Sequence, residues 1–143
     1  MGLGTAANPA LALELARRSA EAGDNRGQYL LAEIYRSGSG TAADLEDALF
    51  WYQAAARGGY VLAQLRLAEL LLSTSLGPAQ PLAAYAWLVV AAANGSEDAA
   101  NLRERLASRL DEQTLAAAEQ AASELQRTLQ PGPHASPETS PSP

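Results

Sequence analysis

The sequence predicts an all-helical domain built from stacked helix pairs, and three observations support this. Alanine and leucine dominate a chain of 143 residues that is 48% hydrophobic and only 6% aromatic. Such a composition favours close-packed helices over strands. Trp51 and Trp87 lie 36 residues apart, and the same offset aligns the sequence from Asn8 to Ala99 without a gap. A glycine recurs with this period, at Gly23, Gly59 and Gly95.

One helix of each pair has clear start and stop signals. Asn8, Asp44 and Gln80 occupy one equivalent position. Asn and Asp are good N-caps because their side-chain oxygens accept the free N–H groups of the first turn. Pro9 and Pro81 follow, where proline sacrifices no helical hydrogen bond. We therefore expect helices to begin near residues 9, 45 and 81 and to end at the three glycines, whose position often requires positive φ.

The other helix of each pair is expected over about 25–37 and 61–74, and a third over 97–109. Leu67, Ala68 and Leu71 form a stripe on one face of such a helix. Ala55-Ala56 and their repeats allow close approach of neighbours, and the tryptophan four residues earlier is expected in the core. One pair cannot bury its own apolar face, so the units must stack.

The C-terminal part departs from the repeat. Asp111 can cap a last helix over about 112–129, whose apolar stripe would make it the capping helix that a stack of repeats needs. That stripe consists of Leu115, Ala118, Ala122 and Leu125. Pro, Ser and Gly dominate from Gln130 onward, which predicts a disordered tail over 130–143.

The N-terminus aligns with a loop rather than with a helix. Residues 1–8 match residues 37–44, so the chain begins inside an inter-helix loop, which we expect to be frayed. Such a start fits a protein that begins there, a trimmed chain, a misassigned start, or a partner that supplies the missing surface. The following helix would expose Leu11, Leu15 and Ala22. We expect a symmetry mate, an upstream segment or a partner's helix to cover this face.

A family resemblance appears in the middle of the chain. The Sel1-like repeat, a relative of the tetratricopeptide repeat, resembles the pattern Tyr35-x-x-Gly38-x-Gly40-x-x-x-Asp44-x-x-x-Ala48-x-x-Trp51-Tyr52-x-x-Ala55-Ala56-x-x-Gly59. The next unit departs in its loop, where Thr74 and Leu76 replace two glycines and Gln80 replaces the aspartate. Its turn is therefore expected to differ, with Gly77-Pro78 forming the bend.

The resemblance implies a fold and a type of function. It implies a right-handed alpha-alpha superhelix of antiparallel helix pairs, a solenoid of about seven helices, with a concave groove that holds protein partners. The first helix of each pair would line this groove. The domain would comprise the second helix of a partial repeat (9–24), full repeats over 25–60 and 61–96, and atypical helices over 97–129.

Charge and hydropathy exclude several partners. The net charge is −6, the pI is about 4.7 and the arginines are scattered, whereas a nucleic-acid binder needs a basic stripe. The longest apolar run, Leu82 to Ala93, is shorter than the roughly 20 residues that span a bilayer. No signal-peptide pattern opens the chain, which favours the cytoplasm, or the periplasm if the N-terminus is trimmed.

The residue inventory argues against catalysis. His134 is the only histidine, it lies in the predicted tail, and the chain has no cysteine or lysine. Common metal, catalytic-triad and Schiff-base sites therefore cannot be assembled, and we expect no metal, no cofactor and no enzymatic activity. The acidic cluster of Asp44, Glu46 and Asp47 lies at a helix start, where negative charge complements the helix dipole.

Candidate partner-binding residues lie at two helix positions that the core stripe leaves free and at which the residue type differs from one repeat to the next. Residues related by the 36-residue offset form a row. One row is Leu30, Arg66 and Leu102, and the other is Glu33, Glu69 and Arg105. Phe50 and Tyr60 are further candidates, since exposed aromatic residues are enriched at interfaces, with local packing under a loop as the alternative.

The sequence therefore predicts a non-catalytic adaptor or scaffold that binds a protein or peptide in the groove. The alternative is the C-terminal end piece of a larger Sel1-like solenoid, or a self-associating structural protein that forms a homodimer through its uncovered N-terminal face.

Overall fold

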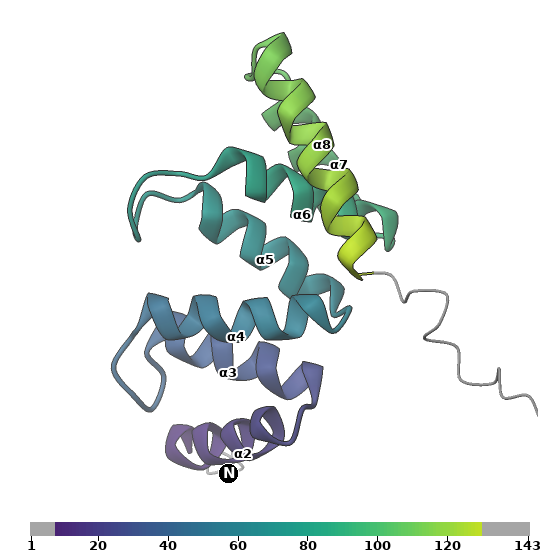
Figure 1. The fold of residues 1–143 in the computed structure, drawn as a ribbon. Coiled ribbons are helices and arrows are strands. Elements are labelled where there is room, and N and C mark those ends of the chain that lie inside the picture. Colours follow the sequence, from purple (N-terminus) through teal and green to yellow (C-terminus); the bar gives the residue numbers. More distant parts are fainter. Residues whose placement is uncertain (1–7, 130–143) are drawn as a thin grey trace, which may run out of the picture.

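The computed structural model describes residues 8–129, which form seven α-helices and no strand. The helices are α2 (Pro9–Glu21), α3 (Asn25–Ser37), α4 (Leu45–Arg57), α5 (Val61–Leu72), α6 (Pro81–Ala93), α7 (Glu97–Ala107) and α8 (Glu112–Leu129). Each helix from α2 to α6 packs on the next, so the chain rises as a stack from α2 at one end to α7 and α8 at the other (Figure 1). The final helix, α8, packs along α6.

Local signals determine where the helices begin and end, as predicted. The side chains of Asn8 and Asp44 accept hydrogen bonds from the backbone N–H groups of Leu11 and Asp47, at 3.0 Å in both cases. The side chain of Gln80 makes no such bond. The helices α2, α4 and α6 each have 13 residues and are followed by a glycine in the left-handed region. Those glycines have φ values of +92°, +97° and +104°, which glycine adopts without a steric cost.

Small residues form the centre of the stack. Nine alanines are fully buried in one cluster, so the backbones of consecutive helices lie close together. They are Ala32, Ala48, Ala55, Ala56, Ala63, Ala68, Ala84, Ala91 and Ala99. Tyr52 and its repeat equivalent Leu88 are the large side chains at the innermost position, each 0% exposed.

The two tryptophans are not equivalent. Trp87 is buried in the core, as predicted, whereas Trp51 is only half-buried at the border of two clusters. The prediction that the tryptophan position is a core position is therefore correct for Trp87 and only partly correct for Trp51. Position 52, next to it, points into the centre instead.

The loops of the two full repeats differ, as the sequence predicts. Gly38 ends α3 in the left-handed conformation, and Gly40 lies so close to the carbonyl of Pro9 that a side chain would not fit there. In the next unit α5 ends at Leu72, two residues earlier than predicted, and the chain continues through extended Ser73 to Gly77 at φ +134°. Helix α7 also ends two residues early, at Ala107.

Three expectations lie outside the described residues: the frayed start over residues 1–8, apart from Asn8 itself, the disordered tail over 130–143, and the location of His134 in that tail. Within residues 8–129, no helix combines the length and hydropathy needed to cross a membrane.

Candidate binding groove

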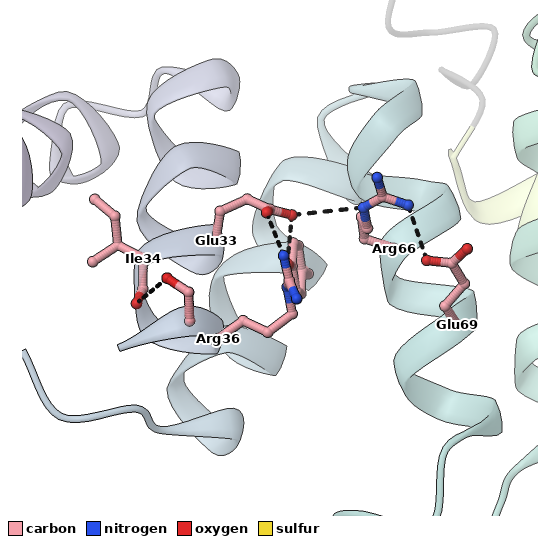
Figure 2. A network of polar contacts seen from close by, with 7 residues as sticks. Glu33, Ile34, Arg36, Arg66 and Glu69 are labelled. Carbon is pink, nitrogen blue, oxygen red and sulfur yellow. Dashed lines mark hydrogen bonds and ion pairs between the residues drawn. The ribbon is translucent and has the colours of Figure 1, made fainter. Parts of the chain in front are cut away.

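A network of polar contacts among charged side chains and the hydroxyl of Tyr52 connects α3, α4 and α5 (Figure 2). Arg36 donates to Glu33 Oε1 at 2.7 Å, and the hydroxyl of Tyr52 donates to Glu33 Oε2 at 2.7 Å. Arg36 Nε also donates to the Tyr52 oxygen at 3.0 Å. Arg66 lies 3.6 Å from Glu33 and donates to Glu69 at 3.0 Å. Glu33 is therefore the hub that ties neighbouring repeats together.

The environment of this hub alters the pKa values of its members. Burial alone would raise the pKa of Glu33, but hydrogen bonds from Arg36 and Tyr52 outweigh it and lower the pKa below its ordinary value. Burial, with the hydrogen bond to Glu33, raises the pKa of Tyr52. The hydrogen bond to Glu33 raises the pKa of Arg36. Glu33 and Arg36 are therefore ionised at neutral pH, whereas Tyr52 keeps its proton and donates it to the carboxylate.

The ring of Tyr52 also belongs to a cluster of three tyrosines. The ring of Tyr29 lies 5.2 Å from that of Tyr60 and 6.0 Å from that of Tyr52, centroid to centroid and tilted in both cases. Such tilted pairs are favourable arrangements of aromatic rings. Tyr60 is thus half-buried in local packing, which corrects the expectation that it is exposed.

Two hollows adjoin the network along the α5 surface. One of about 520 Å³ lies between α5 and α7, and one of about 400 Å³ lies between Arg36 and α5. Both are lined by Arg66, Glu69 and Ser73. The larger hollow adds apolar side chains, Leu65, Leu72 and Leu102, and a polar rim of Asp98, Asn101 and Arg105.

The structure brings some of the predicted candidates together and separates others. Glu33, Arg66 and Glu69 are joined directly, and Arg105 lines the same hollow as Arg66 and Glu69. Leu30 lines a different groove, between α2 and α3. Phe50 is 59% exposed on α4, where its ring meets Trp51 edge-on at 5.0 Å, and it lines neither hollow.

The sequence analysis missed two members of the network around Glu33, Arg36 and Tyr52. Arg36 lies three residues after Glu33 on the same helix, a spacing at which side chains meet, and this signal was available. Tyr52 comes from α4, and no local pattern indicates that its hydroxyl reaches Glu33.

No group of three or more His, Cys, Asp or Glu side chains in residues 8–129 is arranged to hold a metal ion. In the acidic cluster, the carboxylate of Asp44 caps α4, and Glu46 and Asp47 lie in the first turn of that helix.

Solved structures share this architecture. The chain is similar to c5321, a protective antigen present in uropathogenic Escherichia coli strains that displays an SLR fold, with a TM-score of 0.76 and 24% identity. It is also similar to a Sel1 repeat protein from Oxalobacter formigenes, with a TM-score of 0.60 and 23% identity. These matches cover 80% and 81% of this chain but only 25% and 49% of those proteins, so the chain spans a minor part of each. No curated protein matches the sequence.

The family model for the Sel1 repeat matches residues 1–24, 25–60 and 61–96, more than half of the chain. These segments divide the chain at the same 36-residue offset that its own sequence shows. Proteins with Sel1 repeats generally act as non-catalytic scaffolds that bind other proteins. The chain belongs to the Sel1 repeat family and folds as an all-helical Sel1-type solenoid.

Proposed function

We propose that this chain is a non-catalytic adaptor that binds a polypeptide segment along the face formed by α3, α5 and α7. The observation that carries the proposal is the ladder from Glu33 through Arg66 to Glu69, beside which two hollows open. A pre-ordered row of charges next to an apolar floor suits peptide recognition, because little side-chain freedom remains to be lost on binding.

The larger hollow indicates what the segment carries. Its floor of Leu65, Leu72 and Leu102 would accept an apolar side chain. Arg66 is already engaged by two carboxylates, whereas Arg105 is exposed and forms no ion pair with any side chain in residues 8–129. A bound segment would therefore pair a carboxylate with Arg105 and insert an apolar side chain into the same hollow, against Leu65, Leu72 and Leu102.

The test is the capture of partners from the source organism, followed by affinity measurement with the purified partner. The informative variant is Arg105→Ala, and the matched control is Arg127→Ala, another exposed arginine that lies on α8 and lines neither hollow. We expect loss of Arg105 to weaken binding about tenfold or more, the scale of a lost charged contact at an interface. The control variant should bind like the parent.

A further variant separates the apolar floor from the charge. Leu102→Asp places a carboxylate in the hollow and should weaken the same complex while leaving the helical circular dichroism spectrum unchanged, because Leu102 is only half-buried. A partner that binds all three variants equally would show that this face is not the binding surface. Turnover of any bound segment by the purified chain would contradict the non-catalytic part of the proposal.

A further inference from the structure

The outer face of α2 is an apolar surface at one end of the stack. Three of the six exposed large hydrophobic side chains in residues 8–129 gather at this end. Leu11 and Leu15 on α2 are 51% and 55% exposed, and Leu30 on α3 is 42% exposed. The structure therefore confirms that Leu11 and Leu15 lie uncovered by residues 8–129, and an apolar surface of this kind is typical of an interface.

A groove accompanies this face. It has a volume of about 630 Å³ and lies between α2 and α3. Its α2 wall includes small side chains, Ala12, Ala16 and Ser19, and its α3 wall includes Leu30 and Ile34. The groove thus has small side chains on its α2 wall, and its α3 wall combines Leu30 and Ile34 with the charged side chains of Arg26 and Glu33.

Comparison with the next repeat shows that a helix fits such a groove. Advancing Ala16 and Leu30 by one repeat gives Tyr52 and Arg66, and both contact Glu33 of α3. In that unit a helix, α3, fills the corresponding space. In the described part of the chain no helix fills the space beside α2, where Ala16 and Leu30 leave it wider and less polar.

We propose that a second copy of this chain covers this end, with the α2 helices of the two copies packed antiparallel about a two-fold axis. Each α2 presents the same two exposed leucines, Leu11 and Leu15, to its partner. A two-fold axis brings this surface of each copy against the same surface of the other, which is the self-complementary contact that such symmetry produces.

Charge complementarity favours a second copy over an unrelated helix. Glu14 and Arg18 flank the leucines and pair within the helix at 3.2 Å. When the two-fold axis passes at Ala16, midway between them, Glu14 of each copy comes opposite Arg18 of the other. In this register the face presents opposite charges to its own symmetry mate.

The size of the surface predicts a weak dimer. Each copy would contribute one short helix, α2, and the edge of α3. A contact of that extent falls at the small end of specific interfaces, where complexes exchange readily with their free components. Such a dimer would exchange with monomer at micromolar concentrations or above. It would cover Leu30 and leave Arg66, Glu69 and Arg105, which line the larger hollow of the function proposed above, outside the contact.

The test is sedimentation velocity of the full chain over a series from about 1 μM to about 1 mM, the range of weak interfaces. The parent should shift from monomer to dimer within this series. Leu15→Glu should raise the dissociation constant at least about a hundredfold, because each two-fold interface then holds two buried carboxylates. Phe50→Glu is the matched control, since Phe50 is similarly exposed at 59% but lies on α4, and it should dimerise like the parent.

Charge reversal tests the antiparallel arrangement. Glu14→Arg and Arg18→Glu should each weaken the dimer several-fold, and the double variant should recover it, because opposite charges then face each other again. A parent that stays monomeric throughout the series would overturn the proposal, as would a dimer that Leu15→Glu leaves intact. Equal loss in Leu15→Glu and Phe50→Glu would also refute it, because the contact would then not be specific to α2.

Discussion

Helices α2 and α6 occupy the same position in the repeat, yet their surroundings are opposite. Seven of the 13 residues of α6 are buried, against two, Ala16 and Ala20, in α2. The reason is the number of neighbours: α6 packs against α5, α7 and α8, whereas the helix that packs on α2 is α3. Position in a repeat therefore fixes the direction in which a residue points, while neighbouring helices determine whether it is covered.

The two sequences reflect this difference. Helix α6 is apolar all round, as a helix buried on several sides must be. Helix α2 carries charges at Glu14, Arg17, Arg18 and Glu21, and its exposed leucines, Leu11 and Leu15, are covered by no neighbouring helix of residues 8–129. Substitutions in α6 should consequently disturb folding more than the matching ones nearer α2.

The largest effect is expected at the tryptophans. Trp87→Ala should lower the free energy of unfolding by about 3–5 kcal/mol, since Trp87 is only 5% exposed and its removal leaves a cavity. Trp51→Ala should cost about half as much, because the indole of Trp51 is already partly in solvent. Urea denaturation of both variants measures the difference, and equal losses would contradict the assignment of Trp51 to the edge of the core.

The next effect concerns two glutamines at equivalent positions. Gln64 is 1% exposed, donates to the carbonyl of Ala56 at 3.1 Å and accepts from Asn94 at 3.2 Å. Gln28 donates more weakly to Ala20, at 3.4 Å, and its buried Oε1 meets no donor in the described residues. Gly58 stands where Asn94 would be.

We expect Gln64→Leu to cost about 1–3 kcal/mol, because it removes two hydrogen bonds of a fully buried side chain, one to the Ala56 carbonyl and one from the Asn94 amide. Gln28→Leu should be close to neutral, since it removes an oxygen that is buried without a partner. Thermal melts of the two variants under identical conditions test this pair, and a larger loss for Gln28→Leu would show that its amide has a partner beyond those described.

These contrasts show which features the sequence could predict. Helix starts and the main glycine stops depend on neighbours in sequence: Asn8 and Asp44 cap, Pro9 fits the first turn, and Gly23 and Gly59 adopt positive φ. These features were predictable because the physics is local. The two helices predicted two residues too long, which end at Leu72 and Ala107, have no glycine after them to fix the end.

The candidate site was less accessible, because it depends on contacts between units. Alignment placed Glu33 and Glu69 on one row and Arg66 on the other, but it could not show that Arg66 bridges the two acids. Nor could it show that the hydroxyl of Tyr52 crosses from α4 to Glu33, or that Leu30 belongs to the α2 groove instead.

A pH-dependent effect should follow from Glu33. Its pKa in the folded state is lowered, so its ionised form stabilises the fold above the unfolded pKa, and this contribution is lost as pH falls through the folded pKa. Glu33→Gln should therefore cost about 1–2 kcal/mol at neutral pH, the range of a charge-assisted hydrogen bond that is partly exposed. The melting temperatures of parent and variant should begin to converge as pH falls below the ordinary glutamate pKa and should meet below the lowered pKa of folded Glu33.

The control for this effect lies at the other end of the stack. Glu124 pairs with Arg127 at 3.4 Å on α8, where the two side chains are 64% and 67% exposed. Exposed pairs of this kind contribute little, so Glu124→Gln should leave the melting temperature unchanged at neutral pH. A gap between parent and Glu33→Gln that stays constant far into the acid range would show that the carboxylate charge does not stabilise the hub.

The smallest expected change in stability concerns the N-caps of α2 and α6. Asn8 and Gln80 both precede a proline and have similar backbone angles, with φ and ψ of −127° and 74° in Asn8 and −120° and 78° in Gln80. The shorter side chain of Asn8 accepts the hydrogen bond from the N–H of Leu11, whereas Gln80 makes no cap. Gln80→Asn should therefore gain about 0.5–1 kcal/mol, because asparagine is among the best N-caps. The loss expected for Asn8→Ala is of the same size.

Urea denaturation of Gln80→Asn and Asn8→Ala would measure both changes in the free energy of unfolding. A neutral Gln80→Asn alongside a destabilised Asn8→Ala would mean that the looser loop before α6, rather than its missing cap, determines how firmly that helix begins.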